Sequence, residues 1–147
     1  MKLSVESVEV ATLKANGQPW DGPGGPRLPA DQLAAFFARD LDAQLAQLVQ
    51  AGAAPVPPDL FLRVFVHNEQ VIETTDQKSF DAEWPADEGT VEVKAGAPLT
   101  IEVWDRDLMF DDLVGKLEVA VPAAAPAGGR WVLPGFDQVR RLVLRLA

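Results

Sequence analysis

The chain has 147 residues, of which 48% are hydrophobic and 24% are charged, and this composition predicts one soluble globular domain. Its 22 acidic and 13 basic residues give a formal net charge of -9, which disfavours binding to nucleic acid. The absence of cysteine excludes disulfides, thiolate zinc sites and cysteine nucleophiles. No signal sequence and no apolar run of ~18 residues is found, so we expect a cytoplasmic protein without a transmembrane segment. Low lysine beside abundant alanine, proline, glycine and arginine is typical of a GC-rich bacterial genome.

The first part of the chain predicts a strand followed by an insertion. Residues 3–13 alternate apolar and polar side chains, as a half-buried strand does. Residues 16–58 begin and end with segments rich in glycine and proline, which no regular element tolerates. Between them, apolar residues that recur every three or four positions predict an amphipathic helix over 31–51. We expect this helix to dock on its own domain; the alternatives are a lid over neighbouring loops or a partner-binding helix.

From residue 59 onward the pattern is that of short β-strands. An apolar run over 60–66 and a second run over 71–75 predict a hairpin around the only histidine, His67. Further strands are expected at 80–84, 89–94, 99–104, 115–121, 130–133 and 141–146. About eight strands in one domain predict a mainly β fold, an antiparallel sandwich with one inserted helix.

The segment D-R-D-L-M-F-D-D at 105–112 places four carboxylates directly after a buried-looking strand. Two carboxylates ~4 Å apart repel each other by about 1 kcal/mol in water and about 4 kcal/mol at an effective dielectric constant near 20. A divalent cation relieves this repulsion. Calcium, which takes about six to eight oxygen ligands in flexible geometry, suits an all-aspartate loop better than zinc, copper or magnesium. The alternative interpretation is a solvated acidic turn that binds no metal.

The D-R-D of residues 105–107, followed by the D-L-V-G of residues 112–115, resembles the third calcium-binding loop of C2 domains. In that family a strand precedes D-x-D, and a later aspartate precedes two apolar residues and glycine. The resemblance implies a C2-like sandwich with Ca2+ as its cofactor. It also implies the calcium ligands of this loop, which are bridging Asp105 and Asp107, final Asp112 and accessory Asp111.

The sequence D-L-F-L-R-V at 59–64 resembles the end of the family's first loop. This implies that Asp59 is a further ligand and that Asp21 is the first ligand of that loop. The resemblance covers residues 3–14 and 59–146. It departs from the family's pattern because the first loop is normally short, whereas Asp21 and Asp59 are separated by the whole expected helix. The lysine-rich strand with which many C2 domains bind phosphoinositides is also missing.

Leu108, Met109 and Phe110 lie between the carboxylates, at an expected loop tip where water should surround them. Complete burial of such side chains yields roughly 1.5–3 kcal/mol each, so insertion of the tip into a bilayer could supply several kcal/mol. The resemblance implies this role, and the alternative is that the three residues pack under the inserted helix. Trp20, beside Asp21, is a second candidate for membrane contact, with packing against the helix as its alternative.

Enzymatic activity is not expected, because no G-x-S-x-G elbow and no glycine-rich phosphate loop occurs in the chain. The sequence therefore predicts a single C2-like domain over 1–147 that binds calcium. It is expected to dock on anionic phospholipid or on a partner protein through its calcium loops, peripheral to a membrane. The alternative is a calcium-independent protein-interaction or structural module of a bacterial assembly. The oligomeric state is left open.

Overall fold

The computed structural model describes residues 1–20 and 56–147. The chain forms two compact units, one of Met1–Ala11 with Pro58–Ala147 and one of Thr12–Pro57. All strands of the described residues belong to the first unit. The predicted helix over 31–51 falls in the second unit and lies outside the described residues.

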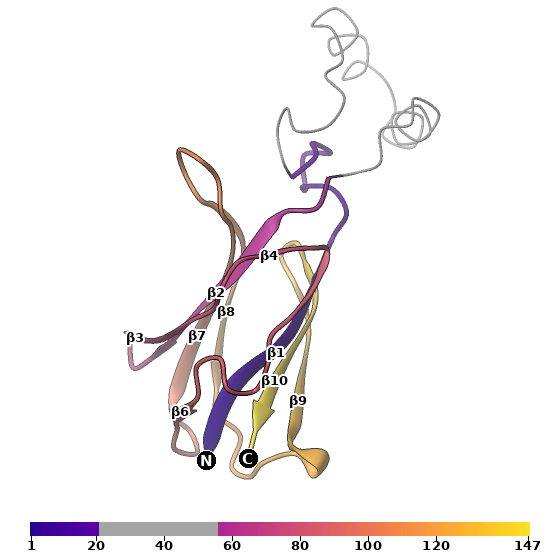
Figure 1. Cartoon of the computed structure of the whole chain (residues 1–147). Helices are drawn as coiled ribbons and strands as arrows, with labels where there is room; N and C mark the ends of the chain where they lie inside the picture. Colours follow the sequence, from indigo (N-terminus) through magenta and orange to yellow (C-terminus); the bar gives the residue numbers. More distant parts are fainter. Residues whose placement is uncertain (21–55) are drawn as a thin grey trace, which may run out of the picture. The chain divides into compact units, whose positions relative to one another are not determined.

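The first unit is a sandwich of two antiparallel five-stranded sheets (Figure 1). One sheet has the order β5-β1-β10-β9, with β6 also pairing with β1. Its strands are β1 (Lys2–Val10), β5 (Asp81–Glu83), β6 (Val91–Glu92), β9 (Arg130–Phe136) and β10 (Val139–Leu146). The other sheet has the order β3-β2-β7-β8, with β4 also pairing with β2. Its strands are β2 (Asp59–Val66), β3 (Glu69–Glu73), β4 (Gln77–Lys78), β7 (Pro98–Asp105) and β8 (Asp112–Ala120), and a short 3-10 turn, η1 (Ala127–Gly129), precedes β9.

The expected mainly β antiparallel sandwich is confirmed, but the strand count of about eight is wrong, since the described residues contain ten strands. Strands of two or three residues, such as β4 and β6, are too short to show an apolar period in the sequence. The expected β2–β3 hairpin is confirmed. His67 and Asn68 alone form this turn, and both have the positive φ that a two-residue hairpin turn requires.

Aliphatic side chains of β1, β2, β7 and β10 form most of the core between the sheets, and Trp84, directly after β5, is also buried. Alternation along each strand turns every second residue inward, where it is removed from water. The fully buried residues of these strands include Leu3, Val5, Val8, Leu60, Leu62, Val64, Ile101, Val103, Leu142, Leu144 and Leu146. This packing fixes the strand ends from which the loops leave the sandwich.

The β7–β8 loop, residues 106–111, extends from one end of the sandwich, and both chain ends lie at the opposite end (Figure 1). There, Lys2 and Ala147 exchange backbone hydrogen bonds. At the loop end, Asp105 is paired with Leu60 of β2 and with Asp112 of β8. No helix within the described ranges has both the length and the apolar character needed to cross a bilayer.

Gly115 of β8 allows the two sheets to approach each other closely. A Cβ atom at this position would lie 3.1 Å from side-chain atoms of both Phe136 and Val139.

We expect Gly115→Ala to lower the free energy of unfolding by roughly 1–3 kcal/mol, because these neighbours have to move. Chemical denaturation measures the change. Glu118→Ala, at an exposed position of the same strand, is the control and should stay within ~0.5 kcal/mol of the wild type. Equal stability of Gly115→Ala and wild type would contradict this explanation.

Candidate functional site

The base of the β7–β8 loop is tied to the start of β2. Asp105 ends β7 and is completely buried, and its Oδ1 accepts a hydrogen bond of 2.9 Å from the N–H of Asp59. The N–H of Arg106 donates in turn to the carbonyl oxygen of Asp59 at 2.8 Å. This reciprocal pair of hydrogen bonds fixes the point at which the loop leaves the sheet.

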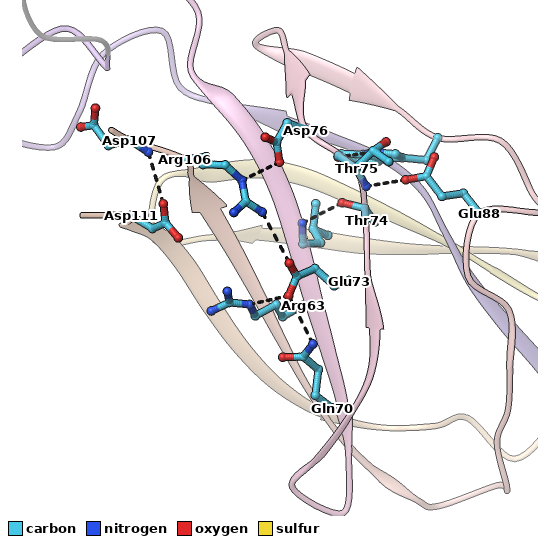
Figure 2. A network of polar contacts seen from close by, with 12 residues as sticks. Arg63, Gln70, Glu73, Thr74, Thr75, Asp76, Glu88, Arg106, Asp107 and Asp111 are labelled. Atoms are coloured by element: carbon cyan, nitrogen blue, oxygen red, sulfur yellow. Dashed lines mark hydrogen bonds and ion pairs between the residues drawn. The ribbon is translucent and has the colours of Figure 1, made fainter. Parts of the chain in front are cut away.

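Further along the loop, the aspartates bind backbone donors. The Oδ1 atom of Asp111 accepts a hydrogen bond from the N–H of Asp107 at 3.3 Å (Figure 2). The Oδ1 atom of Asp107 accepts one from the N–H of Leu108 at 3.1 Å. These carboxylates therefore stabilise the turn of the loop itself.

Five of the six predicted calcium ligands lie in the described part of the chain, and Asp21 lies outside it. The structure brings Asp59 to Asp105, sets Asp105 opposite Asp112, and brings Asp107 to Asp111. Among residues 1–20 and 56–147, no three or more histidine, cysteine or acidic side chains form a group that could hold one metal ion. The carboxylate oxygens fit calcium in kind. Those of Asp105, Asp107 and Asp111 accept hydrogen bonds from backbone N–H groups.

Arg106, the central residue of D-R-D, is a functional candidate that the sequence reasoning missed. Its Nε donates a hydrogen bond of 2.7 Å to Oδ1 of Asp76, and its Nη2 lies 3.5 Å from Oε1 of Glu73 (Figure 2). The guanidinium carbon lies 4.0 Å from the centre of the Phe61 ring. The hydrogen bond to Asp76 is the main cause that raises the pKa of Arg106. Its position inside the acidic motif is visible in the sequence, but its partners are not.

Glu73, at the end of β3, is shared by two guanidinium groups. Its Oε2 accepts hydrogen bonds from Nε of Arg63 at 3.0 Å and from Nε2 of Gln70 at 3.2 Å, while its Oε1 faces Arg106. Figure 2 shows Glu73 between the two arginines. The hydrogen bond from Arg63 is the largest cause that lowers the pKa of Glu73.

This lowered pKa predicts a pH dependence of stability. Because Glu73 has a lower pKa in the folded chain than its ordinary value of 4.5, its stabilisation is complete above that value. The stabilisation is lost as the pH falls through the folded pKa. We expect Glu73→Gln to reduce stability at neutral pH by less than ~1 kcal/mol, since the group is partly exposed, and to weaken the acid-induced loss. Urea denaturation at several pH values measures both effects, with Glu69→Gln as the control. Identical acid dependence in Glu73→Gln and wild type would contradict the prediction.

Leu108, Met109 and Phe110 form the end of the loop, and we call these three residues the apolar tip. Their exposed fractions are 103%, 83% and 78%, which leaves a continuous run of large apolar side chains in contact with water. Trp20 differs from them, because only 1% of it is exposed and the Lys14 ammonium lies 5.9 Å from the centre of its ring. The structure therefore presents the tip, and not Trp20, at the surface.

A model of the C2 domain family matches residues 36–132 of the chain. A solved structure described as that of a C2 domain is similar to 99% of this chain and 94% of its own, with a TM-score of 0.55 and 15% sequence identity. At this identity the structural likeness shows the fold alone. No curated protein matches the chain.

Proposed function

Because the chain belongs to the C2 domain family, we propose that it is a calcium-binding module that docks on anionic phospholipid membrane through its apolar tip. The observation that carries this proposal is the exposure of three consecutive large apolar side chains at the end of the loop. C2 domains are generally binding modules without catalytic activity, and we propose the same for this chain. We also propose a cytoplasmic location at the periphery of a membrane.

The free energy of docking comes from burial of the tip. Complete burial of Leu108, Met109 and Phe110 contributes roughly 1.5–3 kcal/mol for each side chain. The carboxylates beside the tip and the net charge of -9 oppose the approach of the loop to anionic headgroups. Docking on such a membrane therefore requires a positive charge at the loop.

Calcium is the proposed source of this charge. We propose that its ligands are Asp59, Asp105, Asp107 and Asp112, with Asp111 and Asp21 as further contributors. Asp107 and Asp111 each accept a backbone hydrogen bond through Oδ1, and because a carboxylate has two oxygens with about four lone pairs, each can keep that bond and still contribute an oxygen to calcium.

A second candidate function is calcium-independent docking on a partner protein that offers an apolar pocket to the tip. Two observations favour it. The described residues contain no preformed group of three acids, and the loop carries its own cation in Arg106. The two functions share the tip and differ in their dependence on calcium.

Sedimentation with liposomes tests the role of the tip. We expect the wild type to sediment with phosphatidylserine-containing liposomes in millimolar calcium and to stay in solution in EGTA. Leu108→Ser combined with Phe110→Ser should abolish sedimentation, because it removes most of the apolar surface. Val132→Ser is the matched control, since Val132 is 49% exposed and lies on β9, outside the loop. Undiminished binding of the tip variant would contradict the proposal, and calcium-independent binding would favour the second candidate.

Scanning calorimetry tests calcium binding without lipid. A ligand at about 100 times its Kd stabilises the folded state by roughly 2.7 kcal/mol, so millimolar calcium should raise the melting temperature. Asp107→Asn combined with Asp112→Asn should remove this increase, because it deletes two of the proposed ligands. Asp87→Asn combined with Glu92→Gln removes the same charge at exposed positions outside the loop and should keep the increase. No effect of calcium on the wild type would overturn the proposed calcium site.

A further inference from the structure

We infer that Arg106 is a positioning residue: its guanidinium holds the base of the β7–β8 loop in place. The apolar tip is therefore held in its exposed position before any metal ion binds. The importance of this positioning for docking rests on the proposed function. The positioning itself can be measured without lipid or calcium.

The first support is the place of Arg106 in the chain. It directly follows the buried Asp105 and stands two residues before the tip, and its N–H is bonded to the carbonyl oxygen of Asp59. Its backbone is therefore held at the strand end, and its side chain extends across the outer face of the sheet. The contacts of this side chain therefore restrain the base of the loop.

The second support is the set of partners that the side chain reaches. Asp76 follows β3, Glu73 ends β3, and Phe61 belongs to β2, so the guanidinium joins two further segments to the loop. The ring of Phe61 is completely buried although its neighbours in β2 show that it lies on the outer face. A planar guanidinium can cover an aromatic ring and still donate to two carboxylates at its edge. A lysine ammonium is not planar and cannot stack on the ring in this way.

The third support is charge. Arg106 lies between Asp105 and Asp107, in a segment of eight residues that contains four aspartates, and its side chain is only 38% exposed. The guanidinium lies 2.7 Å from a carboxylate oxygen of Asp76 and 3.5 Å from one of Glu73, and its charge also interacts with that of Asp111. This positive charge offsets part of the repulsion between Asp111 and the other carboxylates of the loop.

Arg63 offers a matched control within the same network. Its guanidinium lies 5.2 Å from the centre of the same Phe61 ring, and its Nε bonds to the same Glu73. Arg63 belongs to β2 and not to the loop. Arg63→Gln therefore removes a similar stacked ion pair and leaves the base of the loop in place.

Hydrogen exchange in calcium-free, lipid-free protein tests the inference. In Arg106→Gln, the amides of Asp59, residue 106 and Asp107, which are the bonded amides of the loop base, should exchange roughly tenfold faster or more. The amides of β1 and β10 serve as the internal reference for global stability and should not change. Arg63→Gln should leave the loop amides at the wild-type rate. Arg106→Lys should give an increase between those of these two variants, because it keeps the charge and loses the planar group that stacks on Phe61 and donates to both carboxylates.

Unchanged exchange of the loop amides in Arg106→Gln would overturn the inference, and so would full rescue by lysine. Liposome sedimentation of the same variants forms the second arm. If Arg106→Gln loosens the loop and the wild type never sediments, the positioning role stands and the membrane function fails. If the wild type sediments and the loop of Arg106→Gln exchanges at the wild-type rate, the membrane function stands and the positioning role fails.

Discussion

The antiparallel ladder between β2 and β7 is the constraint on which the site depends. It brings together residues 46 positions apart in the chain, and its register sets Leu60 opposite Asp105 and Phe61 opposite Trp104. A slip of one residue would turn every side chain of a strand to the other face of the sheet. The register therefore decides that Asp105 is buried at the end of the sandwich and that Phe61 lies on the outer face, under the guanidinium of Arg106.

The β7–β8 loop, which follows this ladder, combines exposed apolar side chains with ionised carboxylates. The exposed apolar run is flanked on both sides by carboxylates. Transfer of the apolar side chains out of water is favourable, whereas transfer of the ionised carboxylates out of water costs free energy. Separation along the loop reduces the conflict, because the apolar residues occupy the tip and the ionised ones the flanks and base. Arg106 adds a positive charge at the base, where its partners Asp76 and Glu73 belong to the body of the sheet.

The parts of this structure that were predictable from the sequence are those that rest on regular alternation. Leu99, Ile101 and Val103 repeat with the period of a strand and are buried as expected. Strands β4 and β6 have two residues each, and a period cannot be recognised in so short a segment. The Arg106 network was not predictable, because Asp76 lies 30 positions from Arg106 and only the folded pairing of β2, β3 and β7 brings them together. The acidic loop was recognisable from the spacing of its aspartates. The backbone donors that these aspartates bind depend on the geometry of the turn and were not predictable. The metal ligands stay a prediction.

The location of both chain ends opposite the β7–β8 loop has a practical consequence (Figure 1). Strands of eight or nine residues, at ~3.3 Å per residue, separate the two ends of the sandwich by roughly 25–30 Å. A fluorescent protein, an affinity tag or a sensor surface joined at Met1 or Ala147 is therefore attached on the far side from the tip. Immobilisation of the protein through either terminus therefore leaves the apolar tip accessible to a binding partner in a surface-based binding measurement.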